Sequence, residues 1–140
     1  MLSLIYGSTA SQLFTDSELV ELLKKAREKN ERLDVTGCLL YHKGTFLQVL
    51  EGDEATVVEL FGSIRKDTRH KEVICFLKRS IPEREFGEWR MGFVKAEKDN
   101  FPSEDGYTNF LADPHQTKIN FVKQPSFAHE FMLAFRDNIR

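Results

Sequence analysis

The order of strand-like and helix-like hydrophobic patterns along the chain constrains its fold more than any other feature. Strand-like segments run over residues 2–6, 35–41, 45–50 and 73–77. In the two longer intervals, apolar residues recur every three or four positions, which is typical of one helix face. The middle two strands are separated only by His42-Lys43-Gly44, which predicts a hairpin turn. The predicted order is therefore strand, helix, strand, strand, helix, strand.

Local signals place the ends of these elements. Thr15 and Glu18 have the spacing of a capping box that opens the first helix. Asn30 lies four residues beyond Ala26 and so falls on the apolar stripe of that helix. We expect the first strand to end at Tyr6 and a polar loop to begin at the next residue. The second helix is predicted to follow residues 51–53, with an apolar face formed by Val57, Val58, Phe61 and Ile64.

This order is the split βαβ pattern of an α+β, ferredoxin-like sandwich, in which two helices cover one face of a sheet. A fifth strand is predicted over residues 89–94. In this topology the first and third strands are central neighbours, which places Tyr6 beside Gln48. After residue 96 the pattern changes, and phenylalanines recur every fourth residue over 126–140. We expect one domain over residues 1–96 and a C-terminal helical extension over 97–140 that buries this stripe on the sheet or a partner.

Composition excludes several classes of protein. The 20 basic and 22 acidic residues give a net charge of −2, so nothing favours nucleic-acid binding. No apolar run approaches the roughly 18–20 residues that a membrane span needs. Cys38 and Cys75 both lie in apolar strand-like runs, which predicts reduced core thiols rather than a disulfide or a metal site. These features predict a cytoplasmic protein without a metal.

Three polar residues occupy positions where the pattern calls for apolar ones. Gln48 lies between Phe46 and Leu50 on one strand face. Asn30 lies on the helix stripe, and Tyr6 ends the apolar row of the first strand. Each alone has an ordinary explanation: a core tyrosine with its hydroxyl in water, a solvent-facing glutamine in a shifted register, or a helix C-cap. Their convergence on one face indicates a buried polar site, because an unpartnered buried amide costs about 1–3 kcal/mol.

The spacing of several motifs resembles one known family. These motifs are Tyr6-Gly7-Ser8, Asn30, Thr36-Gly37, residues 46–52 (FLQVLEG), Asp67-Thr68-Arg69-His70 and Trp89-Arg90-Met91. Over about residues 1–96 the chain resembles a BLUF domain, the family of blue-light sensors that use flavin.

The resemblance implies a non-covalently bound flavin, FAD with FMN as the alternative. Tyr6 matches the family's flavin-contacting tyrosine, which donates an electron and a proton to the photoexcited flavin. Gln48 matches the glutamine whose hydrogen bonds then rearrange and give a red-shifted state. Asn30 matches the asparagine at the flavin edge. Further residues are expected to line the same site, namely Ser8, Phe46, Asp67, Arg69 and His70.

Trp89 and Met91 match the fifth-strand pair that the family associates with signal transmission. The expectation is that they share one face of that strand and respond to Gln48. Because the chain shows no catalytic output domain, we expect a photosensor rather than an enzyme. Its output would pass to a partner protein in trans, and short members of the family commonly form homo-oligomers.

Three other functions fit the sequence less well. An acyl-phosphate hydrolase on the same scaffold would need an arginine in the loop after the first strand, and residues 7–11 contain none. An RNA-binding module would need exposed aromatic residues in a basic setting. An interaction domain that has lost its flavin would have no reason to keep Tyr6, Asn30 and Gln48 together.

Overall fold

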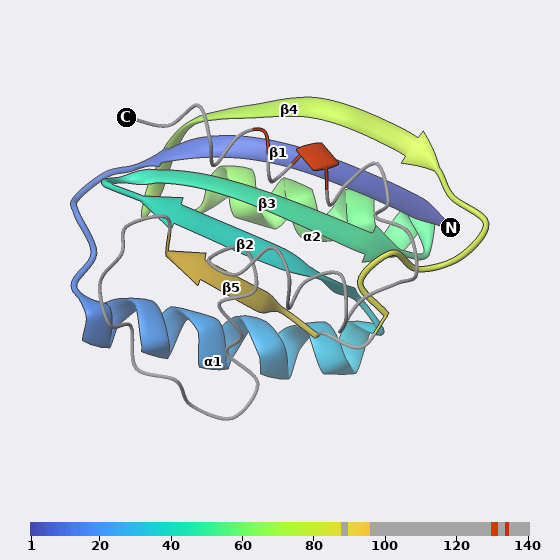
Figure 1. The fold of residues 1–140 in the computed structure, drawn as a ribbon, viewed down its shortest axis with the longest axis horizontal. Helices are drawn as coiled ribbons and strands as arrows, with labels where there is room; N and C mark the ends of the chain where they lie inside the picture. Colours follow the sequence, from blue (N-terminus) through green and yellow to red (C-terminus); the bar gives the residue numbers. More distant parts are fainter. Residues whose placement is uncertain (88–89, 96–129, 132–133, 135–140) are drawn as a thin grey trace.

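The computed structural model describes residues 1–87, 90–95, 130–131 and 134. Within this part of the chain a five-stranded sheet has the order β4-β1-β3-β2-β5. Figure 1 shows α1 along the β2–β5 side of the sheet and α2 behind β1 and β3. The elements are β1 (Leu2–Ala10), α1 (Asp16–Leu33), β2 (Thr36–His42), β3 (Thr45–Gly52), α2 (Glu54–Lys66), β4 (His70–Ser80) and β5 (Gly92–Lys95).

The sheet topology confirms the predicted ferredoxin-like sandwich with one strand added. β1 and β3 are antiparallel neighbours in the middle of the sheet, and Tyr6 lies directly opposite Gln48. β5 adds to the edge of β2 in parallel. Residues on the helix side of the sheet pack with both helices into one core, to which the strands contribute Leu4, Leu39, Tyr41, Phe46 and Leu50 and the helices Leu19, Leu23, Val57 and Phe61.

The first strand is longer than predicted, and the expected loop at Gly7 was wrong. β1 continues to Ala10 because its backbone pairs with β3 on one side and β4 on the other, which overrides the weak strand propensity of Gly7-Ser8. A Cβ at Gly7 would lie 2.6 Å from the Phe76 ring, so a side chain here would have to displace that ring. The strand therefore carries Ser8 into the sheet.

The first helix confirms the predicted start and corrects the predicted end. Thr15 and Glu18 form a capping box. The helix continues to Leu33 and ends at Asp34, whose left-handed backbone (φ 55°) donates its N–H to the last-turn carbonyls of Asn30 and Glu31. Asn30 is therefore a buried residue within the helix and not its C-cap.

The second helix presents a slightly different face from the predicted one. Val57 and Phe61 are buried as expected, whereas Val58 is 44% exposed. Leu60 takes the fourth core position. Val58 and Leu60 are two positions apart, which is about half a helical turn, so they face different sides.

The fifth strand begins later than predicted. It starts at Gly92, which pairs with Cys38, so Met91 lies just before the strand instead of on one of its faces. Residues 90–91 instead contact α1 and β3. Trp89 lies outside the described residues. The predicted helix over 126–140 also lies largely outside them, although Glu130, Phe131 and Ala134 are helical.

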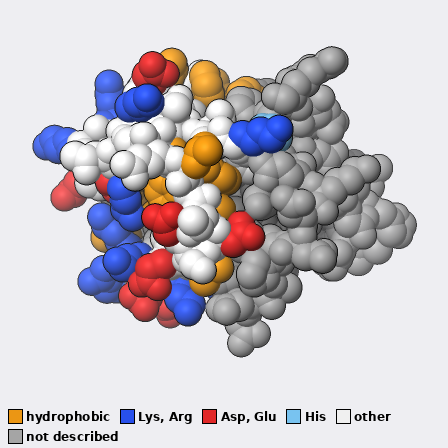
Figure 2. Space-filling view, turned by 90° about the vertical axis from the view of Figure 1, so that its left-hand side faces the viewer, with side chains coloured by type: hydrophobic (Ala, Val, Ile, Leu, Met, Phe, Trp, Pro, Cys, Tyr) orange, Lys and Arg blue, Asp and Glu red, His pale blue; other side chains and the backbone are white. Residues whose placement is uncertain are grey.

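The described surface carries mixed charge. Figure 2 shows acidic and basic side chains interspersed on one side of the molecule, with apolar side chains visible between them. Cys38 is buried, Cys75 is half-buried, and both are free thiols. Among the described residues, no helix is both long and apolar enough to cross a membrane, and no group of three or more His, Cys, Asp or Glu residues is placed to hold a metal ion.

Candidate functional site

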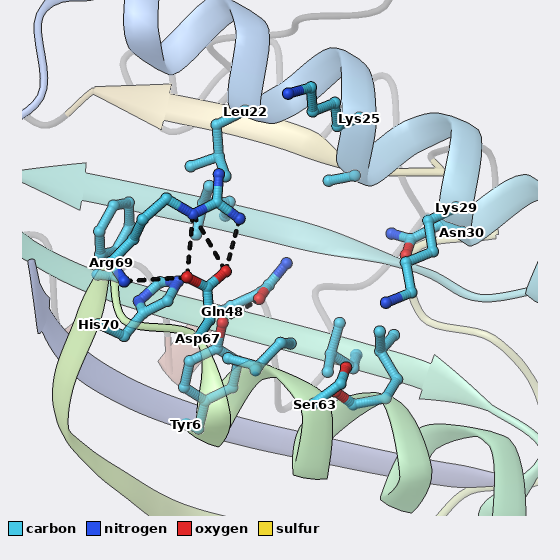
Figure 3. A pocket seen from close by; sticks show the side chains of 16 residues that line it. Tyr6, Leu22, Lys25, Lys29, Asn30, Gln48, Ser63, Asp67, Arg69 and His70 are labelled. Carbon is cyan, nitrogen blue, oxygen red and sulfur yellow. Dashed lines mark hydrogen bonds and ion pairs between the residues drawn. The ribbon is translucent and has the colours of Figure 1, made fainter.

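A cavity of about 210 Å³ lies between the two helices and the central strands. Its floor is the helix-facing side of the sheet, including Tyr6 and Gln48, and its walls are α1 and α2. Figure 3 shows Arg69 and His70 at one end of the cavity and Lys29 and Asn30 at the other. Small-molecule pockets typically measure about 300–1,000 Å³, so this volume suits a flat ring system rather than a whole dinucleotide.

Gln48 makes hydrogen bonds on both sides of its amide. The buried Tyr6 hydroxyl donates a short hydrogen bond to Gln48 Oε1. Gln48 Nε2 donates to the Sδ of Met91 at 3.3 Å, and Met91 has no solvent exposure. The predicted contact of Tyr6 with Gln48 is therefore confirmed, and Met91 joins the pair through a weak sulfur acceptor.

Burial determines the protonation state of Tyr6. Desolvation, with a smaller effect from the charge of Asp67, raises the pKa of the Tyr6 phenol well above its usual range. The phenol is consequently neutral at neutral pH and donates its proton in the hydrogen bond to the Gln48 oxygen.

Asn30 presents an unused acceptor to the cavity. Its Nδ2 donates to the backbone oxygen of Arg90 at 2.7 Å. Its Oδ1 has no hydrogen-bond partner among the described residues, although the side chain lines the cavity. An amide oxygen in the lining of the cavity can accept a hydrogen bond from a ligand.

One end of the cavity is ordered by Asp67, Arg69 and His70 at the junction of α2 and β4. The Asp67 carboxylate accepts from Arg69 Nη2 at 2.6 Å and from Arg69 Nε, which lies 3.1 Å from both carboxylate oxygens. This arginine holds the pKa of the Asp67 carboxyl at about 2, so the pair stays charged. The Nδ1 of His70 lies 2.9 Å from Ser8 Oγ, and the ring packs on Phe46 with centroids 5.0 Å apart.

The structure brings most of the sequence-predicted site residues together. Tyr6, Asn30, Phe46, Gln48, Asp67, Arg69 and His70 line the cavity. Ser8 contacts His70 behind this lining, and Met91 contacts Gln48. The sequence reasoning missed two cavity-lining lysines, Lys25 and Lys29. Their signal was their four-residue spacing on the same helix as Asn30.

A profile of the BLUF family, described as sensors of blue light using FAD, matches residues 1–92. The alpha subunit of photoactivated adenylate cyclase from Euglena gracilis is 38% identical over 87 residues, which cover 62% of this chain and 8% of that protein. The blue light- and temperature-regulated antirepressor BluF of Escherichia coli K12 is 34% identical over 86 residues, which cover 61% of this chain and 21% of that protein. The chain thus spans a small part of these relatives.

Two solved structures illustrate the similarity in fold. The dark-state structure of BlrB, a BLUF protein, superposes with a TM-score of 0.69 at 26% identity and covers 99% of this chain and 96% of its own. Klebsiella pneumoniae BlrP1 with FMN and cyclic diGMP gives a TM-score of 0.77 at 27% identity, covering 99% of this chain and 35% of its own.

Proposed function

Because the chain belongs to the BLUF family, the sensors of blue light using FAD, we propose that Tyr6 and Gln48 form its light-driven switch. The observation that carries the proposal is the buried hydrogen bond from the Tyr6 hydroxyl to Gln48, on the floor of the cavity between the helices. Residues 1–96 would act as the photosensor and residues 97–140 as an extension.

The residues of the cavity fit a flavin ring. The ring is flat and apolar along one edge and carries amide-like donors and acceptors along the other, which matches a cavity with apolar walls and amide groups at Gln48 and Asn30. The Oδ1 of Asn30 and the second N–H of Gln48 would hold the polar edge. When bound, the flavin supplies an excited state that accepts one electron.

Tyr6 is the electron donor in this proposal. It is a neutral, buried phenol in the floor of the cavity. After an electron leaves Tyr6, its phenolic proton becomes strongly acidic and moves along the existing hydrogen bond toward Gln48. The return of the electron and the proton restores the starting phenol, so the cycle leaves Tyr6 unchanged.

Gln48 stores the signal by exchanging its donor and acceptor ends. With Oε1 toward Tyr6, its Nε2 donates to Met91. In the reversed arrangement the amide N–H groups face the Tyr6 oxygen, and Oε1 faces a thioether that has no proton to donate. Light therefore breaks the hydrogen bond of Gln48 with Met91 and alters the packing of the residues directly before β5.

We further propose that the output acts in trans in the cytoplasm, through a partner protein or a homo-oligomer, and that the chain has no enzymatic activity of its own. The E. coli relative is an antirepressor, and its matching region covers only 21% of that protein. The cyclase relatives match over a still smaller share of their length, from 8% to 11%.

Absorption spectroscopy tests the proposal. The purified chain should be yellow, and blue light should shift its flavin absorption reversibly to the red. Tyr6→Phe should bind flavin and lose the shift, because the ring is kept and only the hydroxyl is removed. Gln48→Ala should also bind flavin without shifting.

Tyr41→Phe is the matched control. Tyr41 is a buried tyrosine in the same core, but its hydroxyl accepts from the backbone N–H of Phe14 and it does not line the cavity. This variant should keep a normal shift. A colourless protein that takes up no added flavin, or a normal photocycle in Tyr6→Phe, would contradict the proposal.

A further inference from the structure

Residues 84–91 are the later part of the segment that joins β4 to β5, and a buried carboxylate binds the beginning of this part. Glu51 at the end of β3 has no solvent exposure. Its side chain accepts from the backbone N–H of Phe86 at 2.6 Å and of Glu85 at 2.9 Å. Thr36 Oγ1 donates to the same carboxylate at 2.8 Å. The first part of the segment is therefore fixed to the strand that carries Gln48.

Asp34 joins the segment to the end of α1. Its carboxylate pairs with Arg84 at 3.1 Å and with Arg90 at 3.0 Å. Arg84 also donates to Thr36 Oγ1 and to backbone oxygens, so it is held without the Asp34 carboxylate. The guanidinium of Arg90 has no other partner among the described residues, so its position depends on Asp34.

Arg90 in turn positions Met91. The backbone oxygen of Arg90 accepts from Asn30, and the next residue, Met91, is buried with its sulfur against Gln48. A single residue therefore connects the ion pair with Asp34 to the group that Gln48 contacts. Arg90 and Met91 precede β5, so side-chain contacts rather than the hydrogen bonds of a strand hold them in place.

We propose that Asp34 and Arg90 are positioning residues that return Met91 to Gln48 after illumination and so set the rate of dark recovery. This inference rests on the proposed function. Reversal of the Gln48 amide removes its hydrogen bond to Met91. The ion pair of Asp34 with Arg90 stays intact, because neither group takes part in the photochemistry. The ion pair of Asp34 with Arg90 favours the state in which Met91 contacts Gln48. Loss of the ion pair therefore slows the return to that state.

Two substitutions at Asp34 test the inference without disturbing the helix end. Asn and Gly both tolerate the left-handed backbone at this position. With FAD bound, Asp34→Asn and Asp34→Gly should slow the decay of the red-shifted state by about two- to threefold, as expected for a solvent-exposed ion pair. The size of the red shift and the flavin affinity should stay at wild-type values. Raising the salt concentration should slow recovery in the wild type and leave Asp34→Gly unaffected.

Two further variants separate the ion pair from general effects. Glu31→Gln removes a nearby exposed charge that contacts neither arginine and should recover at the wild-type rate. Arg90→Gln should recover as slowly as Asp34→Asn, and the double variant no more slowly than either single one. A purely structural role for Asp34 would lower the melting temperature without changing the salt dependence of recovery.

The outcomes distinguish this inference from the proposed function. A wild-type protein without a red shift contradicts the proposed function itself. A normal red shift with unchanged or faster recovery in both Asp34 variants, or additive effects of Asp34→Asn and Arg90→Gln, overturns only the role of the pair.

Discussion

Glu51 is a carboxylic acid without solvent exposure, three residues from Gln48 on β3. It accepts hydrogen bonds from the backbone N–H groups of Glu85 and Phe86. Glu51→Gln replaces one acceptor oxygen by a donor and leaves a buried N–H facing another N–H. We expect a loss of about 1–3 kcal/mol in the free energy of unfolding, measured by urea denaturation.

The matched control for this prediction is Glu83→Gln, an exposed residue on the same loop. It should change the unfolding free energy by less than about 0.5 kcal/mol. Equal stability of the two variants would show that the buried carboxylate does not fasten the loop.

His70 makes the stability of the protein depend on pH. Burial, as the main cause, lowers the pKa of this imidazole below its usual 6.5. The folded state therefore binds fewer protons than the unfolded state as the pH falls below 6.5, and stability is lost in that window. The wild-type melting temperature should fall between pH 6.5 and pH 5, and His70→Gln should flatten this part of the curve.

Asp67 makes the stability of the protein depend on pH in more acidic solution. The pKa of Asp67 is lowered from 3.8 to about 2, so the stability that its pair with Arg69 contributes is lost only as the pH falls through that lower range. Asp67→Asn should therefore change the curve below pH 4. Because the charge of Asp67 also raises the pKa of His70, this variant should lose more stability between pH 6.5 and pH 5 than the wild type. For His70, melting-temperature curves that run parallel in the wild type and His70→Gln between pH 6.5 and pH 5 would show that His70 does not cause the loss of stability there.

At the scale of elements, the sequence predicts whatever is encoded locally. The capping box at Thr15, the turn at Lys43-Gly44 and the position of Asn30 on the α1 stripe follow from spacing alone, and the structure confirms them. The extension of β1 beyond Tyr6 could not be predicted in this way. It depends on pairing with β3 and β4, which are remote in sequence.

The α1 helix also presents two cations to the cavity. Lys25 and Lys29 lie one turn apart, line the cavity with Asn30, and form no ion pair among the described residues. Lys25 also lines an adjoining hollow of about 390 Å³. A flavin nucleotide with its ring in the inner cavity could place its phosphate near these two lysines.

Replacing both lysines should therefore discriminate between flavins. Lys25→Ala with Lys29→Ala should weaken FMN and FAD binding by about three- to tenfold, because exposed charge contacts are screened. Riboflavin, which lacks phosphate, should bind as it does to the wild type. Titration monitored by flavin fluorescence measures this, with Lys78→Ala on β4 as a control. Equal weakening for all three flavins would argue that the lysines shape the cavity instead.

At the scale of the whole molecule, the predicted topology already places Tyr6 beside Gln48. The ferredoxin-like order makes β1 and β3 central neighbours, so Tyr6 and Gln48 had to lie side by side. The contacts of Arg90 and Met91 were beyond such reasoning. They lie before β5 and are held by Asp34, Asn30 and Gln48, none of which a strand pattern connects to them.

The same contacts predict where light should loosen the molecule. If the reversed Gln48 amide repels the Met91 sulfur, illumination should increase backbone hydrogen exchange over residues 84–91, with little change in α2. Met91→Leu keeps the side-chain volume and removes the sulfur acceptor. It should retain the red shift, which depends on Tyr6 and Gln48, and lose most of the light-dependent exchange.

Met91→Leu should also abolish light-dependent changes in the assembly of the protein. If the segment before β5 transmits the signal, any light-dependent change in molecular mass measured by light scattering should disappear in Met91→Leu together with the exchange change. Met91→Ala should behave alike but unfold more easily, since it leaves a cavity. A wild-type protein that shifts to the red with no altered exchange over residues 84–91 would place the signalling route elsewhere, since the contact of Gln48 with Met91 is then kept in both states.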